Sequence, residues 1–91
     1  MNLRLRLTAR ERQFISDFGY PFEDVQSQLD RLANTRAARV VHIDSYFFDH
    51  LLADLSRSER ELRDRALLAE LDELYTELEM QAMRQGHVVG A

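Results

Sequence analysis

The chain has 91 residues, a formal net charge of −4, no cysteine, and twelve basic residues that are all arginine. This length allows one domain with a modest core, because domains usually hold ~100–150 residues. The absence of cysteine excludes a disulfide framework, a thiolate nucleophile and a cysteine-bound zinc site. Codon bias explains the use of arginine in place of lysine more simply than selection for guanidinium groups does.

The sequence carries no membrane-spanning pattern. Its longest uncharged apolar stretch is residues 40–43, far short of the ~18 apolar residues that a membrane span needs. The first residues include arginines but no apolar segment of the length found in secretory signals. We therefore expect a cytoplasmic protein that does not partner with membranes.

The N-terminal region predicts a strand followed by a helix. Leu3, Leu5 and Leu7 alternate with polar residues, which is typical of a half-buried strand over 2–7. Thr8 and Glu11 form a capping-box pattern that starts a helix over about 9–18. Gly19 follows this helix, where a residue in the left-handed conformation is often required.

Two further helices and one strand are predicted in the middle of the chain. Pro21 suits a first helical turn, and the apolar residues after it recur at steps of three and four over about 21–33. The β-branched cluster over 38–43 predicts a short strand that pairs with the first one. Asp44 or Ser45 then caps a helix over about 45–56.

The last predicted helix is the longest. Two overlapping capping boxes begin at Ser56 and Ser58, and nothing breaks the helix until Gly86. The pattern predicts a helix over about 58–85. We expect a mainly α fold with four helices and a short two-stranded β ribbon, as a single helical domain over 1–85. Residues 86–91 are expected to form a frayed C-terminal tail.

An apolar seam runs along the last helix. Four leucines step by four, three and four, and a tyrosine widens the seam: Leu67, Leu71, Leu74, Tyr75 and Leu78. Gln81 and Gln85 end it, so it is too short for a free-standing coiled coil, which usually needs three or four heptads. The seam therefore belongs to the core of the domain or to the interface of a homodimer, and the sequence leaves both open.

Charge is distributed unevenly. The first twelve residues carry a balance of +3, and residues 66–83 carry five carboxylates and no basic residue. The candidate contacts to a partner or to nucleic acid are Arg4, Arg6, Arg10 and Arg12. An arginine-bearing β ribbon can enter a DNA groove, but arginines on an edge strand also simply block strand addition. The negative net charge argues against non-specific nucleic-acid binding.

Exposed aromatic residues are a further candidate feature. Six aromatic residues are more than a core of this size needs: Tyr20, Phe22, Tyr46, Phe47, Phe48 and Tyr75. The corner around Tyr20 and Phe22 is either a packed link between two helices or an anchor of a binding surface, where tyrosine is enriched.

Catalytic and metal-binding patterns are weak. His50 and Asp54 lie one helical turn apart, but a metal site needs three or four convergent ligands. Ser45 lies near His42 but is better explained as a helix cap. The three glycines form no phosphate-binding loop. We expect no enzyme activity, no cofactor and no metal.

These observations favour a small intracellular protein–protein interaction or regulatory protein of the adaptor, antitoxin or inhibitor type. We expect it to act through its surface, as a homodimer formed by the long C-terminal helix, on a protein partner whose identity the sequence leaves open. The alternative is a DNA-binding transcriptional regulator that uses the arginine-bearing N-terminal segment.

Overall fold

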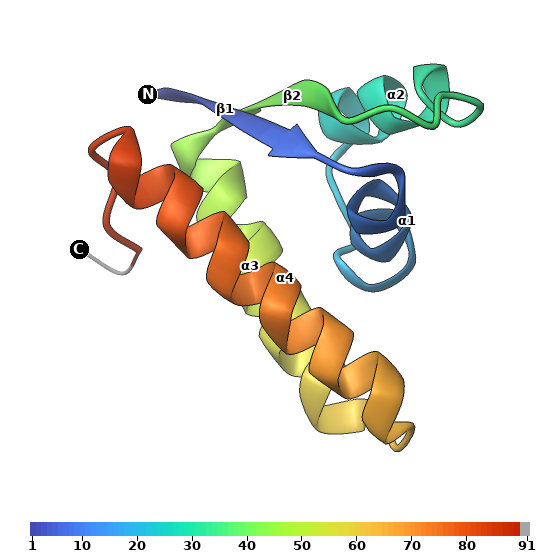
Figure 1. The fold of residues 1–91 in the computed structure, drawn as a ribbon. Helices are drawn as coiled ribbons and strands as arrows, with labels where there is room; N and C mark the ends of the chain where they lie inside the picture. Colours follow the sequence, from blue (N-terminus) through green and yellow to red (C-terminus); the bar gives the residue numbers. More distant parts are fainter. Residues whose placement is uncertain (90–91) are drawn as a thin grey trace.

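A computed structural model describes residues 1–89 of the chain (Figure 1). The elements are β1 (Asn2–Leu7), α1 (Ala9–Phe18), α2 (Glu23–Arg31), β2 (Arg39–Asp44), α3 (Ser45–Glu61) and α4 (Arg65–Arg84). The two strands form a ribbon at one end of the molecule, and α3 and α4 extend away from it side by side. The prediction of a mainly helical fold with four helices and a two-stranded sheet is confirmed.

The ribbon is antiparallel, with Leu5 opposite Val41 and Arg4 opposite His42. Side chains alternate across a strand, so Leu3, Leu5 and Leu7 face the core while the arginines between them face solvent. Asp44 ends β2 and caps α3 by accepting a hydrogen bond from the Tyr46 N–H. The predicted strand–helix junction is therefore correct.

The boundary between α3 and α4 differs from the prediction. α3 continues to Glu61, and the break falls at 62–64 rather than at 56–58. Ser58 does not cap a helix: it lies buried inside α3, and its hydroxyl donates to the Phe18 carbonyl at 2.7 Å. Asp64 is the actual N-cap, accepting from the Ala66 and Leu67 amides. The Ser58 hydroxyl thus binds a distant carbonyl at the end of α1 instead of capping a helix as the local pattern predicts.

The corner between α1 and α2 is also different. Gly19 has a φ of −96°, and Tyr20 has the positive φ, at 44°. A Cβ on Gly19 would lie 2.4 Å from Leu51 Cδ1 and 2.8 Å from the Ile15 carbonyl oxygen. Gly19 is therefore required for close packing, and the left-handed residue is displaced to position 20.

The C-terminal segment packs back onto the body. Gly86 adopts a φ of 88°, as a glycine after a helix often does. The His87 N–H donates to the Ala82 carbonyl, His87 Nε2 lies 2.7 Å from Asp49 Oδ1, and Val89 packs against the core. Residues 86–89 thus contact the body of the protein, and residues 90–91 of the predicted tail lie outside the described part of the chain.

The apolar seam of α4 lies in the core of its own chain. Leu71, Leu74 and Leu78 are 0%, 3% and 0% exposed. Leu67 and Tyr75 are half-buried against the same core. Core packing within one chain accounts for the seam, and of its five residues only Leu67 and Tyr75 keep partly exposed side chains. Within residues 1–89, no helix combines the length and apolar character needed to cross a membrane.

Truncation of a seam leucine tests this placement. We predict that Leu71→Ala lowers the free energy of unfolding by about 2–5 kcal/mol, because it leaves a cavity in a closed core. Urea denaturation followed by circular dichroism measures the change. Met83→Ala, at an exposed position of α4, is the matched control and should change stability by less than about 0.5 kcal/mol. A midpoint that rises with protein concentration would contradict a core confined to one chain.

Candidate interaction surfaces

Two glutamines of α4 bind the outer edge of β1. Gln85 accepts from the Arg4 N–H at 2.8 Å and donates to the Arg4 carbonyl at 2.7 Å. Gln81 makes the same pair of bonds with Arg6, at 2.8 and 2.9 Å. Residues i and i+4 of a helix are separated by a rise of about 6 Å, which matches the roughly 6.7 Å between strand residues i and i+2. The two side-chain amides therefore replace a neighbouring strand.

The outer edge of β2 is bound in the same way from α2. Gln28 accepts from the His42 N–H and donates to the His42 carbonyl, both at 2.8 Å. Unpaired strand edges invite pairing with other chains. At Arg4, Arg6 and His42 the edge groups already have partners, so strand addition at these positions is blocked.

One face of the ribbon remains open to solvent. Arg4, Arg6, Val40 and His42 are exposed on it, and we call these four residues the open ribbon face. The helices lie beneath the ribbon and beside its edges in Figure 1, leaving this face uncovered. Arg4 and Arg6, predicted as partner contacts, are thus accessible, and neither makes an ion pair within residues 1–89.

A shallow groove of about 510 Å³ borders the open ribbon face. Arg6 lines it from β1 and Arg84 lines it from α4, and Glu11 and Glu77 are also among its lining residues. Both carboxylates are engaged: Glu11 accepts from the Thr8 N–H and Glu77 accepts from the Gln81 side chain. The groove therefore contains two arginines and two carboxylates, and both carboxylates keep their negative charge because their hydrogen-bond donors are neutral amides.

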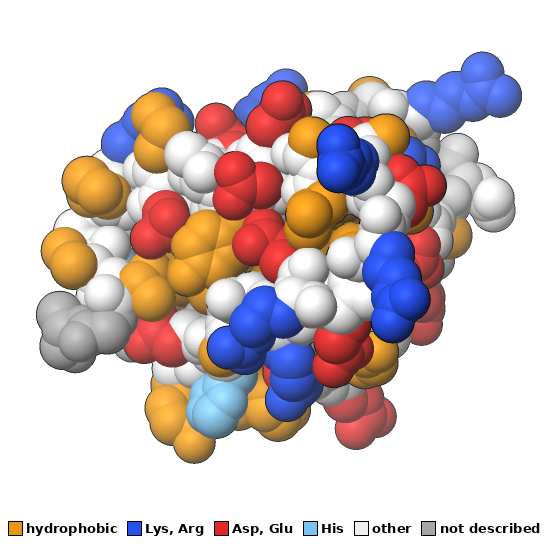
Figure 2. Space-filling model, turned by 90° about the horizontal axis from the view of Figure 1, so that it is seen from below, with side chains coloured by type: hydrophobic (Ala, Val, Ile, Leu, Met, Phe, Trp, Pro, Cys, Tyr) orange, Lys and Arg blue, Asp and Glu red, His pale blue; other side chains and the backbone are white. Residues whose placement is uncertain are grey.

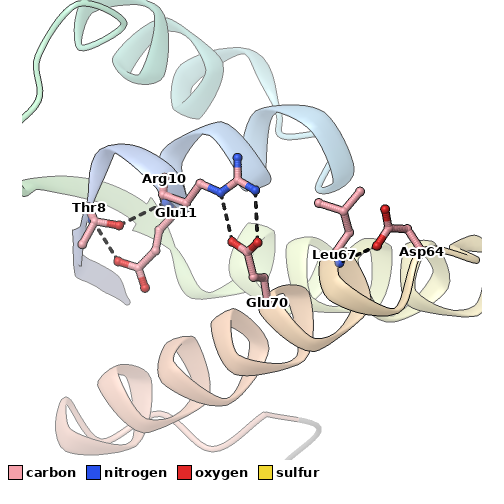
Figure 3. A network of polar contacts seen from close by, with 6 residues as sticks. All are labelled: Thr8, Arg10, Glu11, Asp64, Leu67 and Glu70. Carbon is pink, nitrogen blue, oxygen red and sulfur yellow. Dashed lines mark hydrogen bonds and ion pairs between the residues drawn. The ribbon is translucent and has the colours of Figure 1, made fainter.

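Arg10 is not available to a partner in the way that the sequence suggested. Its guanidinium makes two hydrogen bonds to Glu70 on α4, at 3.0 and 3.2 Å (Figure 3), and lies 4.5 Å from the centre of the Phe14 ring. The hydrogen bond to Arg10 lowers the pKa of Glu70, and the attraction between the charges adds to this. One carboxylate of the acidic stretch of α4, Glu70, is therefore neutralised by Arg10 of the same chain.

Arg12 is a structural residue. It is 5% exposed, and its guanidinium donates to the Leu7, Ala37 and Thr35 carbonyls. Arginine carries five N–H donors, so one side chain can join the end of β1 to the loop before β2. The prediction of Arg12 as a partner contact is corrected accordingly.

An aromatic cluster lies on the surface where α2 and α3 begin. The ring centroids of Phe22 and Phe47 are 4.5 Å apart, and those of Tyr46 and His50 are 4.6 Å apart. Tyr46 is 64% exposed and Phe22 is also exposed. With Tyr20 at the adjoining corner, we call Tyr20, Phe22, Tyr46, Phe47 and His50 the aromatic surface. His50 thus packs among aromatic rings rather than joining Asp54, which pairs with Arg57.

Acidic side chains gather between α3 and α4. Figure 2 shows hydrophobic side chains flanked by acidic ones on the face seen from below. Burial raises the pKa of Glu59, and the nearby Asp72 raises it further. Its Oε1 atom is buried without a hydrogen-bond partner. Burial together with Glu79 and Glu59 also raises the pKa of Tyr75. Within residues 1–89, no three metal-ligating side chains converge.

Comparisons with known proteins give no relatives. No protein-family model, no curated protein and no solved structure matches the chain. Functional interpretation therefore depends on the surfaces themselves. In the sequence, Gln81 and Gln85 mark only the end of the leucine seam, and the pattern does not predict their role at the β1 edge. Their spacing of one helical turn was the available signal, but it has meaning only once α4 is placed beside β1.

Exchange of one glutamine tests the edge contact. We predict that Gln81→Glu lowers the free energy of unfolding by about 1–2 kcal/mol at neutral pH, because a carboxylate would face the Arg6 carbonyl and Glu77. Hydrogen exchange of the Arg6 amide should become faster. Gln13→Glu, on the exposed surface of α1, adds the same charge and should leave this amide unchanged. Equal exchange rates at Arg6 in all three proteins would contradict the contact.

The environment of Glu59 generates a pH prediction. Its pKa is raised above the ordinary value of 4.5, so the folded state binds the proton more tightly than the unfolded state does. The stability conferred by this group is therefore lost as the pH rises from the pKa of Glu59 in the unfolded state to its higher pKa in the folded state. Glu59→Gln should stabilise the protein at about pH 7 and have no effect at about pH 3. Denaturation at both pH values measures the difference, and an equal gain at both would contradict the burial effect.

Proposed function

We propose that this chain is a protein-interaction or regulatory protein that binds a partner protein through the aromatic surface. The conformation of Tyr20 carries the proposal. Tyr20 is 66% exposed and holds a φ of 44°, which costs a residue with a Cβ roughly 1–2 kcal/mol. A large side chain that is both exposed and strained contributes little to folding, and such strain is concentrated at binding sites.

The surroundings of the aromatic surface indicate the chemistry of the partner. A groove of about 540 Å³ is lined by Phe22 and Phe47, with Glu23 and Asp24 beside them. Aromatic residues in a pocket with a polar rim are typical of the centre of a protein interface. A segment with one apolar anchor next to basic side chains fits this groove. The proposed partner therefore presents an apolar residue flanked by arginine or lysine.

A single substitution separates stability from binding. We predict that Tyr20→Gly raises the free energy of unfolding by about 0.5–1 kcal/mol, because glycine adopts a positive φ at little cost. The same variant should lose the partner that the wild-type chain captures from an extract of the source cells. Denaturation and quantitative affinity capture measure the two effects.

Met80→Ser together with Met83→Ser removes two other exposed apolar side chains from α4 and is the control that should keep the partner. Retention of the partner by both Tyr20→Gly and Phe22→Ser would overturn the proposal. Sedimentation equilibrium at tens of micromolar distinguishes a different protein from a second copy of the chain. A dimer that persists in Tyr20→Gly would place self-association elsewhere.

A further inference from the structure

The open ribbon face is a second surface, and the proposed partner of the aromatic surface does not account for it. We propose that it binds a single-stranded nucleic acid. In this arrangement the Arg4 and Arg6 guanidiniums contact backbone phosphates, and the His42 ring stacks on a base. Guanidinium groups match the geometry of phosphate oxygens, and single strands are bound by stacking on rings of this kind.

The charges around the face are arranged in favour of an anionic ligand. Arg4 and Arg6 are exposed, and Arg84 lines the same groove as Arg6. Asp44 pairs with the N-terminal amine, whereas Glu11 and Glu77 accept only from neutral amides and keep their charge, so the positive charge is that of Arg4 and Arg6 on the open ribbon face itself. The net charge of −4 therefore does not describe the local charge of this face.

The backbone beneath these side chains is held in place. Arg4 and Arg6 have their N–H and carbonyl groups bound by Gln85 and Gln81, and His42 has its own bound by Gln28. Arg4 lies opposite His42 in a pair whose backbone groups point outward, so their Cβ atoms are roughly 4.5–5.5 Å apart. A cation and a ring are thus presented together from a rigid ribbon, which lowers the entropy lost on binding.

The helices beside the ribbon edges favour a single-stranded nucleic acid over a duplex as the ligand. A bare two-stranded ribbon can enter the major groove of DNA, which is about 12 Å wide. Here α4 lies along the β1 edge and α2 contacts the β2 edge. These helices would collide with the phosphate backbones on either side of a groove. A single strand lying across the face meets no such obstacle, and His42 with Val40 offers a flat surface to a base more readily than to an acidic peptide.

Fluorescence anisotropy with labelled oligo-U RNA and oligo-dT of about 12 nucleotides tests the proposal. The full chain should bind at about 50 mM salt and weaken steeply toward about 200 mM. Arg4→Gln with Arg6→Gln should lower the affinity at least about tenfold and reduce the salt slope by about 1.4, the effect of two lost phosphate contacts. His42→Ala should lower the affinity about fivefold or more. Comparison of the affinities for the RNA and the DNA oligonucleotide shows which sugar is preferred.

Arg60→Gln with Arg63→Gln is the matched control. It removes the same charge from exposed positions near the α3–α4 turn, at the opposite end of the molecule from the ribbon (Figure 1). This control should change the affinity by less than about twofold. Circular dichroism shows whether each variant is folded. The proposal is overturned by absence of binding at low salt, by equal binding of a duplex, by equal competition from polyglutamate, or by an equal loss in the control.

Discussion

A two-stranded sheet has two free edges, and the way in which this chain closes them determines the rest of its structure. An isolated ribbon of two strands is marginally stable in water, and each outward backbone group needs a partner. Gln81 and Gln85 supply partners to β1, and Gln28 supplies them to β2. The ribbon is thereby joined laterally to two helices, so that its inner face can complete the core while its outer face stays open.

The same requirement explains the composition of α4. Leu71, Leu74 and Leu78 bury one stripe of the helix in the core. Gln81 and Gln85 continue toward the C-terminus, where the helix lies beside the strand edge rather than above a sheet face. A leucine at either position would bury an apolar group against unpaired peptide groups, which is unfavourable. The change from leucine to glutamine along α4 therefore coincides with the part of the helix that lies beside the β1 edge.

The parts of the fold that depend on local patterns could be predicted from the sequence. The Thr8–Glu11 capping box (Figure 3) and the alternation in β1 agree with the prediction, and Asp44 is one of the two residues predicted to cap α3, because each feature is set by residues close in the chain. The errors arose where a distant contact outweighed a local pattern. Ser58 fits a helix cap but bonds to Phe18, and Gly19 fits a left-handed position but is held close to Leu51. Arg12 likewise looked like a surface residue because its three carbonyl partners come from other segments.

The N-terminal arginines differ in whether their side chains make contacts that stabilise the fold. Arg10 pairs with Glu70 and Arg12 joins backbone carbonyls, so both are explained by the fold. Arg4 and Arg6 belong to the same short segment, yet only their backbone groups are used, and their guanidiniums extend into solvent. If blocking strand addition were their only role, it would be redundant, because the glutamine amides already occupy that edge. The guanidiniums of Arg4 and Arg6 are therefore the part of the basic N-terminus that no contact within residues 1–89 explains, and they are the groups on which the proposed nucleic-acid contact depends.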